Sequence, residues 1–460
     1  MKCDKELMRR VREAWEDAAS LRYNRRRLKN FAYGRQWDDV TVTADGRRLT
    51  ERQRAVEEGR IPITNNIIRR MIKGILGHYS RLTALEKASA EDDTLGFSPL
   101  CERDARALEE LLISGTTIQY VGQGTGEVEN VSPERFIFRR FTRSDASDCG
   151  FMGRLLDLPL EEVLLRFSER DPRRAETIRD AYRNAERRSS LFPTGREGEY
   201  DPASASLPGC VRVIEVWERR AMEILRLHDP ERGDYRITSL SKADSVDRLN
   251  ARRRREGRRE VSASYDIIRG WVCTFLTPEG MVLDSFSAPG HPFAVRFYPM
   301  IDGEVHSAVE DVVDQQKLVN RLVSTLDQII SASAKGVLLY PADQLPEGFT
   351  WRDVRRIWSN PSGILPFKRT SRTLMPHQVS NSGNSSGAND LLRTQLQIFD
   401  EISGATASSH GRASSITGEG MLRVQLENAL ISMLDILNSF HEFIAQRDAM
   451  LKETQKSNDN

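Results

Sequence analysis

The clearest match to a catalytic motif lies at residues 383–387, which read GNSSG and fit the Gly-x-Ser-x-Gly pattern of a serine nucleophile. That pattern activates a serine only where a buried strand precedes it and a helix follows, so that the turn is strained. Here it lies in a tract of serine, asparagine and glycine with no apolar strand before it. We therefore interpret the match as chance.

Glycines and carboxylates elsewhere in the chain do not form a stronger site. The glycines at 122, 124 and 126 partly fit a phosphate-binding fingerprint, but the last required glycine is missing and no helix begins there. Glu310, Asp311 and Asp314 begin a predicted helix, where acidic side chains complement the helix dipole. The seven histidines are dispersed, and neither GxxxxGK[ST] nor HExxH occurs. We therefore expect no enzyme, no cofactor and no metal site.

Arginines gather between Arg248 and Arg259, in the sequence RLNARRRREGRRE. One interpretation is a patch that binds DNA or RNA through its phosphates. The other is a solvated helix-and-loop excursion between two strands, since glutamates are interspersed. No aromatic side chains interleave for base stacking. The sequence favours the solvated excursion but leaves both interpretations open.

The composition limits the class of protein. The 460 residues allow two or three domains, and 68 basic against 67 acidic residues give a net charge of +1. A protein that coats nucleic acid is usually strongly basic. The five cysteines are scattered without a CxxC pair, which favours reduced thiols. No apolar run resembles a signal peptide or a membrane span. We expect a soluble protein made in a cytoplasm.

The most distinctive element is a strand that leads into a long helix. Residues 293–297 form a short apolar run, and Pro299 and Asp302-Gly303 predict a turn. Residues 309–333 then predict one amphipathic helix, about 37 Å long at about 1.5 Å per residue. One face of this helix carries Val309, Val312, Val313, Gln316, Val319, Leu322, Val323, Leu326, Ile329 and Ile330. Its length suggests a strut, although an ordinary core helix would show the same spacing.

The chain before this strut predicts a mixture of helices and strands. Thr64 or Asn65 is expected to cap the helix at 67–79. The other predicted helices cover residues 5–31, 100–114, 160–167 and 171–188. The predicted strands and hairpins cover residues 115–131, 133–141, 211–217 and 267–283.

The chain after the strut predicts a small excursion between helices. A strand at 335–341 is followed by a helix at 350–358 and a second short strand within 359–369. A hinge rich in serine and glycine leads to a helix at 390–402. A polar, glycine-rich segment then precedes a closing helix at 421–446, and we expect the last residues, TQKSNDN, to be disordered.

Several motifs in this order resemble the portal proteins of tailed bacteriophages, of the short-tailed type. The resemblance rests on an aromatic-Gly-x-Gln-Trp segment near Tyr33, a step through Pro62 to Asn66, and IDGE followed by VxDQQxxVNRL at 312–322. The segment from Glu401 to Met421 also matches. The family commonly has Asp-Pro where this chain has Arg140-Phe141, which is a departure.

The resemblance implies an α+β portal fold that forms a ring. It implies a mixed wing domain, two long stem helices, a small α/β clip, a tunnel loop and a closing helix. The corresponding segments are 1–307 for the N-terminal region and wing, 308–334 for the first stem helix, 335–376 for the clip, 377–402 for the hinge and second stem helix, 403–420 for the tunnel loop, and 421–460 for the closing helix and short tail.

The resemblance also implies a function and partners. The ring, usually of twelve subunits, would occupy one vertex of the virion capsid, where double-stranded DNA is packaged and ejected. It would dock the terminase large subunit, then head-completion and tail adaptor proteins, and would contact capsid and scaffold proteins but no membrane. Two alternatives remain, namely another head-tail adaptor ring protein and a nucleic-acid-processing enzyme.

The resemblance assigns roles to three sets of residues. The tunnel loop that lines the DNA channel would include Ser408, Ser409, His410, Gly411 and Arg412. The partner surface of the clip would include Trp351, Arg355, Arg356 and Trp358, although the two tryptophans could instead form the clip's own small core. The packing stripe of the stem helix would include Val312, Val319, Leu322, Val323 and Leu326. Polar residues beside that stripe (Gln315, Gln316, Asn320 and Arg321) are expected to face neighbouring helices of the ring.

Overall fold

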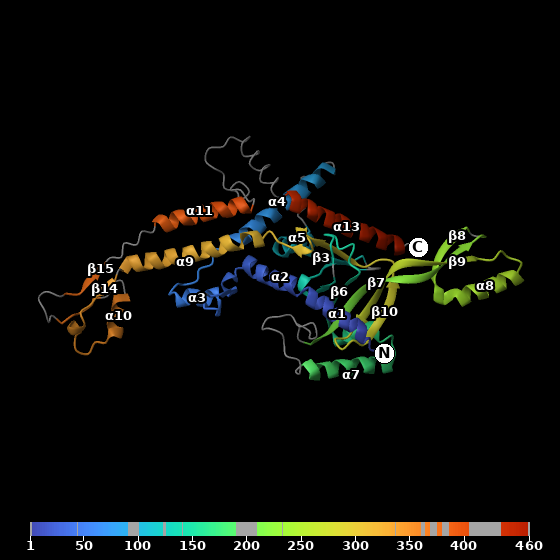
Figure 1. Cartoon of the computed structure of the whole chain (residues 1–460), viewed down its shortest axis with the longest axis horizontal. Coiled ribbons are helices and arrows are strands. Elements are labelled where there is room, and N and C mark those ends of the chain that lie inside the picture. The colour runs from blue at the N-terminus through green and yellow to red at the C-terminus, as the bar shows by residue number, and fades with distance from the viewer. Residues whose placement is uncertain are drawn as a thin grey trace. The chain divides into compact units, whose positions relative to one another are not determined.

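The computed structural model describes residues 2–43, 45–90, 101–122, 126–139, 141–189, 209–231, 233–335, 337–359, 364–368, 375–379, 386–403 and 434–458. Helices and antiparallel strands are mixed along the chain (Figure 1), so the predicted α+β class is confirmed. The chain divides into two compact units. The first comprises Met1–Lys29, Gly74–Glu310 and Leu430–Asn460, and the second comprises Asn30–Lys73 and Asp311–Ala429. No helix in the described part is long and apolar enough to cross a membrane.

A six-stranded antiparallel sheet forms the centre of the first unit. Its strands follow the order β10-β9-β7-β6-β5, with β8 paired to the outer half of β7. The strands are β5 (Phe136–Phe138), β6 (Phe151–Pro159), β7 (Cys210–Asp229), β8 (Asp234–Ser239), β9 (Ser262–Leu276) and β10 (Val282–Ala288). The predicted strand at 211–217 is therefore only the first part of β7, which continues for another twelve residues as a ribbon with β9.

One face of this sheet is covered by α1 (Lys5–Asp17). Leu7, Val11 and Ala14 recur at three- and four-residue spacing and pack on Ile214 and Val216 of β7. The helix predicted over 5–31 is in fact two helices, α1 and α2 (Ala19–Ala32). The break at Ala18 lets that residue enter the core, where it is 1% exposed.

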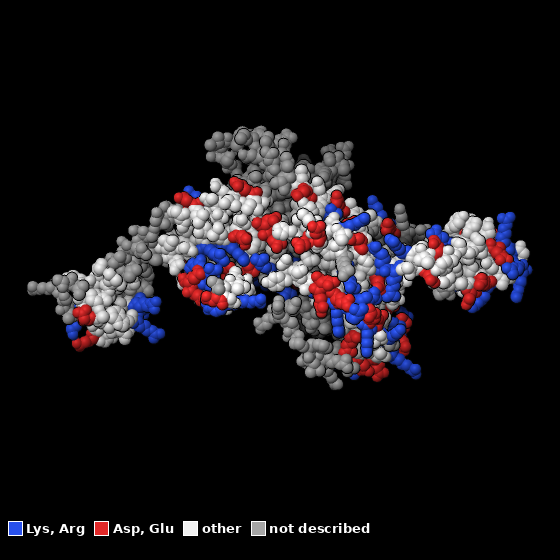
Figure 2. Space-filling view, in the orientation of Figure 1, with Lys and Arg blue, Asp and Glu red and all other residues white. Residues whose placement is uncertain are grey.

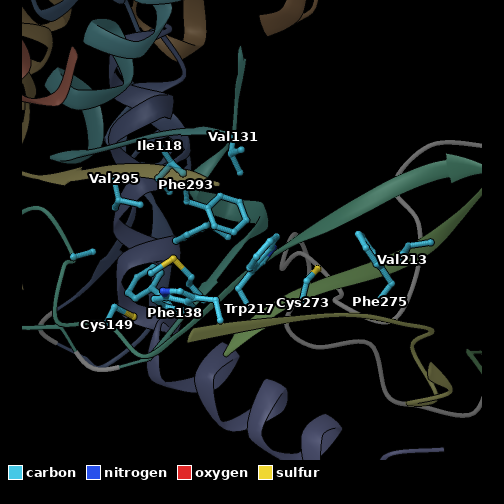
Figure 3. Close-up of a cluster of buried hydrophobic side chains, with 14 of the residues drawn as sticks. Ile118, Val131, Phe138, Cys149, Val213, Trp217, Cys273, Phe275, Phe293 and Val295 are labelled. Atoms are coloured by element: carbon cyan, nitrogen blue, oxygen red, sulfur yellow. The ribbon is translucent and has the colours of Figure 1, made fainter. Parts of the chain in front are cut away.

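The other face of the sheet carries an aromatic cluster that a second, three-stranded sheet completes. This sheet has the order β11-β3-β4, formed by β11 (Phe293–Phe297), β3 (Thr116–Val121) and β4 (Val128–Asn130). The β11 strand has the bounds that the sequence predicts. Figure 3 shows Phe293 and Ile118 of this sheet together with Trp217 and Cys273 of the larger one. Phe293 meets Phe136 edge-on, with ring centres 5.1 Å apart.

Two helices pack on the three-stranded sheet. They are α5 (Glu102–Ser114) and α13 (Leu434–Asn458), and Phe440 and Phe443 of α13 are fully buried. Gly115 ends α5 at φ +66°, and a Cβ there would lie 2.2 Å from the His306 carbonyl oxygen, so only glycine fits. The predicted closing helix is described from residue 434, and its part at 421–433 lies outside the described residues. Because α13 runs to Asn458, the prediction of disorder from residue 454 is wrong for residues 454–458.

Further elements complete the first unit. They are α6 (Leu160–Phe167), α7 (Pro172–Ser189), α8 (Ala243–Arg255), and the hairpin of β12 (Met300–Ile301) and β13 (Glu304–Val305). The hairpin turns at Asp302 and Gly303, as the sequence predicts. The arginine cluster begins on α8, a helical excursion between β8 and β9. The placement of the cluster on a helix and loop between two strands is as the sequence predicts, and it is compatible with either role of the arginines.

The second unit is built around α9 (Val313–Lys335), which the 3-10 turn Glu310–Val312 precedes. Its other elements are the 3-10 turn Gln36–Asp38, β1 (Val40–Val42), β2 (Arg48–Thr50), α3 (Glu51–Glu57), β14 (Val337–Leu339), the 3-10 turn Ala342–Gln344, α10 (Trp351–Ser359), β15 (His377–Val379) and α11 (Ser386–Ile402). The helix α4 (Ile67–Ala90) begins in this unit and continues into the first.

Two predictions for this unit need correction. The strand that pairs with β14 is β15, whereas residues 364–368 form no strand. Pro366 lacks the N–H that a paired strand would donate. The second helix begins at Ser386 rather than 390, so Ser386 and Gly387 of the GNSSG motif are helical.

Candidate functional site

The buried face of α9 contains polar side chains as well as apolar ones. Gln316 is 0% exposed, Asn320 is 3% exposed and Ser324 is 1% exposed. These three residues, here called the polar ladder, recur every four positions and therefore lie one above another on the helix. Of the predicted packing stripe, Val312, Val319 and Leu326 are buried, whereas Leu322 and Val323 are half-buried.

The segment that leads into α4, residues 63–67, runs along the polar ladder in the opposite direction. Ser324 Oγ accepts a hydrogen bond from the Ile63 N–H at 3.0 Å, Asn320 Oδ1 from the Asn65 N–H at 3.0 Å, and Gln316 Oε1 from the Ile67 N–H at 3.0 Å. Four residues of α9 span about 6 Å, which lies within the reach of two residues of the facing segment, at most about 7 Å. The two spacings match, so the N–H groups of Ile63, Asn65 and Ile67 each reach a successive side chain of the polar ladder.

The side-chain amide groups of Gln316 and Asn320 also donate hydrogen bonds within the second unit. Gln316 Nε2 donates to the Asn65 carbonyl at 2.6 Å and to Asn320 Oδ1 at 3.0 Å. Asn320 Nδ2 donates to Gln36 Oε1, and Gln36 Nε2 donates to the Phe31 carbonyl at 2.9 Å. A buried polar network is favourable only when its members are paired, and here it joins three separate segments of the chain.

The same network caps the N-terminus of α4. Asn66 Oδ1 accepts from the Arg69 N–H at 3.0 Å, the geometry of an N-cap. Gln316 Oε1 accepts from the N–H groups of Ile67 and Ile68, so α9 also satisfies this helix end. The expectation that Thr64 or Asn65 caps this helix is wrong, because Asn66 holds that position.

Two ion pairs flank the ladder. Lys317 Nζ lies 2.5 Å from Asp39 Oδ2, and Arg321 lies 2.6 Å from Glu51 Oε1. Both carboxylate side chains are nearly buried, at 6% and 5% exposure, and each pair ties α9 to the segment 30–73. The prediction that Gln316, Asn320 and Arg321 face neighbouring helices of a ring therefore fails, because they bind this chain's own N-terminal segment.

The part of α9 beyond the ladder leaves apolar surface open. Helix α11 packs on α9, and the two lie side by side in Figure 1. Phe399 of α11 is 2% exposed. Ile330 on α9 is 62% exposed, and Leu391 and Ile402 on α11 are nearly half exposed. This surface is available to another protein chain.

The small excursion between α9 and α11, residues 337–379, covers most of the segment 335–376 that is predicted to be a clip, and that assignment stays a prediction. Tyr340 organises its described part, since the Tyr340 hydroxyl donates to the Pro366 carbonyl at 2.7 Å. The Tyr340 ring meets the Trp351 ring edge-on, with centres 5.9 Å apart. Thr350 and Asp353 cap α10 reciprocally, and the hydrogen bonds from Thr350 help to lower the pKa of the Asp353 carboxyl.

The described part of this excursion has few buried apolar side chains. Among its described apolar side chains only Val354 is fully buried. Trp351 is 51% exposed, Arg355 and Arg356 are exposed, and Trp358 is half-buried. Further exposed apolar side chains are Leu339, Ile364, Phe367 and Met375. The prediction that Trp351, Arg355, Arg356 and Trp358 form a partner surface is compatible with their exposure and stays a prediction.

The predicted channel residues Ser408, Ser409, His410, Gly411 and Arg412 lie outside the described residues. Sequence reasoning does not predict the polar ladder, because it assigns polar residues on an apolar stripe to contacts between subunits. Its signal is present in the sequence as Gln316, Asn320 and Ser324 at four-residue spacing. The described residues contain no group of histidine, cysteine and carboxylate side chains placed to hold a metal ion.

The exposed apolar side chains on α9, on α11 and in the excursion are typical of surface that contacts other protein chains. The model of the phage P22-like portal protein family matches residues 125–433. That match covers more than half of the 460-residue chain, so the protein belongs to the phage P22-like portal protein family. It is a bacteriophage head-tail connector that serves DNA packaging, as the sequence motifs predict. No curated protein sequence matches the chain.

Proposed function

We propose that this portal protein forms a ring, of about twelve copies as its family resemblance suggests, at one vertex of the phage capsid. Double-stranded DNA enters and leaves through the ring. The observation that carries the proposal is the polar ladder, which fixes the position of α9 along the segment 63–67. A helix used as a strut around a channel must not slide under load, and directional hydrogen bonds resist sliding.

The exposed apolar surface of α9 and α11 supports ring formation. Ile330, Leu391 and Ile402 would be covered by the neighbouring copy, because exposed apolar side chains on one pair of packed helices suit a contact site. Ile330→Glu introduces a charge there without disturbing the buried ladder. We expect this variant to remain folded and to elute as smaller species in size-exclusion chromatography. Val40→Glu, at a residue with 50% exposure in the same unit, is the matched control and should form normal rings.

We further propose that the clip docks the terminase large subunit and later the head-completion and tail adaptor proteins. Trp351 is the strongest candidate, because a half-exposed tryptophan supplies a large contact area at a small entropy cost. Trp351→Ala should weaken terminase binding by roughly 2 kcal/mol, about thirtyfold, while rings still form. Tyr235→Ala, which removes an 80% exposed aromatic from the first unit, should leave terminase binding unchanged. Equal affinity in the wild type and both variants would remove the clip from the proposal.

The segment that contains Ser408, Ser409, His410, Gly411 and Arg412 is proposed to line the DNA channel. It is rich in small polar residues with few charges, so it can approach a moving duplex without strong phosphate contacts. Deleting residues 407–414 should leave ring assembly intact but impair packaging or retention of DNA. A glycine-serine replacement of the same length separates the effect of length from that of the side chains. Normal full heads from the deletion variant would contradict this role.

The proposed place of the protein follows from these contacts. It would be made in the host cytoplasm, join capsid and scaffold proteins during head assembly, and remain in the virion at the portal vertex. Infection with a phage that carries the deletion, followed by measurement of the DNA content of heads, tests the whole sequence of events. Heads that lack the portal protein altogether provide the reference for failed packaging.

A further inference from the structure

The helix α8 stands on the ribbon formed by the outer halves of β7 and β9, and its orientation is fixed on one face. Asn250 Nδ2 donates to the Val261 carbonyl and Asn250 Oδ1 accepts from the Val261 N–H, both at 2.9 Å. Arg253 forms a two-pronged ion pair with Asp229, at 2.9 and 2.6 Å, and is 6% exposed. Val246 completes this buried face. The opposite face of the helix is therefore held outward.

That outward face carries a row of arginines. Arg248, Arg252 and Arg255 have the spacing i, i+4, i+7 and are all exposed, and Arg259 follows in the adjoining loop. Figure 2 shows basic side chains gathered over α8, the helix labelled in Figure 1, with acidic ones among them. The acidic residues Asp244 and Asp247 of α8 stay near its N-terminal half, so positive charge is concentrated at the C-terminal end.

The acidic residues near this row neutralise only part of it. Glu256 pairs with Arg252, Glu260 with Arg254, and Glu231 with Arg258. Within the described part of the chain, no acidic side chain forms an ion pair with the guanidinium group of Arg248, Arg255 or Arg259, although Glu231 accepts a hydrogen bond from the Arg259 backbone N–H. Ion pairs between exposed side chains are weak, so Arg252, Arg254 and Arg258 can exchange their carboxylates for a stronger anion.

The chemistry of this face identifies its ligand. The surface carries exposed guanidinium groups, which pair with phosphate through two parallel hydrogen bonds. No aromatic residue occurs between 243 and 260, so the stacking that binds unpaired bases has no platform. Leu249 is the exposed large apolar side chain of α8, which is too little for a protein interface core. We propose that the arginine face of α8 (Arg248, Arg252, Arg255 and Arg259) binds the phosphate backbone of double-stranded DNA.

The choice of duplex DNA rests on the proposed function, since a portal protein meets packaged DNA. Each copy contributes only a few phosphate contacts, and a single copy binds weakly. A ring multiplies these contacts, because copies held together bind one polymer with a raised effective concentration. The binding is independent of sequence and is sensitive to salt, because phosphate contacts release counterions.

The test compares assembled rings of the full chain in a DNA-binding titration at several salt concentrations. The variant is Arg248→Gln/Arg255→Gln/Arg259→Gln, and the probe is a fluorescent duplex. The slope of log affinity against log salt should become shallower by about 0.9 for each phosphate that the variant no longer neutralises. The control is Arg173→Gln/Arg179→Gln/Arg183→Gln, which removes the same charge from exposed positions of α7 and should leave the slope unchanged.

Three results would overturn the proposal. They are an unchanged slope in the α8 variant, an equal change in both triple variants, or competition by polyglutamate as strong as by unlabelled duplex. The last result would assign the face to an acidic protein. Electron microscopy of each variant is done first, so that a failure to form rings is distinguished from a failure to bind DNA. If the triple variant does not form rings, Arg255→Gln and Arg259→Gln are titrated singly against Arg179→Gln.

Discussion

Each of the two units is stabilised internally by a different kind of interaction. In the first unit, Phe293 and Phe297 are fully buried in a cluster of aromatic and aliphatic side chains. In the second unit, the fully buried Gln316 holds the backbone of a neighbouring segment through hydrogen bonds. Apolar burial is not directional, whereas hydrogen bonds require a defined distance and angle.

This difference indicates which part of the chain depends on a precisely defined position. A cluster such as that around Phe293 specifies a compact body but tolerates small repacking, as apolar cores generally do. The polar ladder specifies one axial position of α9 along residues 63–67, because a shift that is not a whole turn leaves buried amides unpaired. The first unit therefore depends mainly on apolar burial, and α9 of the second unit depends on a defined register.

The largest expected effect is in the aromatic cluster. Phe293→Ala removes a side chain that contacts Phe136 and Tyr120 and leaves a cavity between the two sheets. We expect the free energy of unfolding of the first unit to fall by about 3–5 kcal/mol, measured by chemical denaturation. Phe286→Ala is the control, since Phe286 is 41% exposed, and it should reduce stability by about 1 kcal/mol or less. Equal reductions would mean that the cluster is not the stabilising centre.

The second prediction for the first unit concerns the dependence of its stability on pH. Burial, helped by the nearby Arg219, lowers the pKa of His291 from 6.5 to about 4. The unfolded chain therefore binds more protons than the folded one between these values, so stability should fall as pH falls from about 6.5 to 4. A shift of 2.5 units corresponds to about 3 kcal/mol at most.

The variant His291→Gln tests this assignment. Its side-chain oxygen can still accept the hydrogen bond from the Phe293 N–H but cannot be protonated in this range. We expect its unfolding free energy to depend less on pH than that of the wild type between pH 6.5 and 4. Parallel curves for the two proteins would show that other groups control the acid sensitivity.

In the second unit, Gln316→Leu keeps the side-chain volume but removes the rung of the ladder that lies next to the start of α4. The N–H groups of Ile67 and Ile68 and the Asn65 carbonyl are then left without this partner. We expect stability to fall by about 2–3 kcal/mol and hydrogen exchange at Ile67 and Ile68 to become faster.

The neighbouring substitution Gln315→Leu is the matched control for this rung. Gln315 is half-buried, and its Oε1 has no hydrogen-bond partner among the described residues. We expect less than about 0.5 kcal/mol of change and normal exchange at Ile67. If both leucine variants behave alike, the ladder does not hold α9 in register.

The smallest effect is expected at the surface of the clip. Arg356 is exposed and pairs with Asp353 one turn earlier, at 3.1 Å. Arg356→Gln should change stability by less than about 0.5 kcal/mol, because exposed helix pairs contribute little. A thermal unfolding curve that matches the wild type is expected. A reduction well above that size would show that the clip depends on its ion pairs more than on its capped helix.

The sequence predicts helices and strands best where the hydrophobic pattern agrees with a residue, such as proline, that marks the end of the element. The strand 293–297 is an apolar run that proline precedes, and it matches β11 residue for residue. The prediction for β7 stops at Trp217 because exposed charged residues such as Arg220 and Glu223 then interrupt the apolar pattern. That part of the strand is stabilised by its partners β8 and β9, which local pattern does not reveal.

The site is less predictable because its contacts join residues far apart in the chain. Gln316 and Asn65 are separated by 251 positions, and no local rule pairs them. The stripe on α9 was predicted from spacing, and its buried part agrees at Val312, Val319 and Leu326. Which chain the polar residues on that stripe bind is a question of tertiary structure. Asn320 and Arg321, expected at contacts between subunits, instead bind residues of the same unit.

If the ladder-fixed helix is a strut of a ring, the assembled protein must enclose a channel. Negative-stain electron microscopy of the purified full-length protein tests this most directly. We predict rings with a central channel and a single rotational symmetry, and the Ile330→Glu variant should give few or none. Uniform particles without a central channel in the wild-type protein, at concentrations where portal rings are stable, would contradict the role of α9 as a strut.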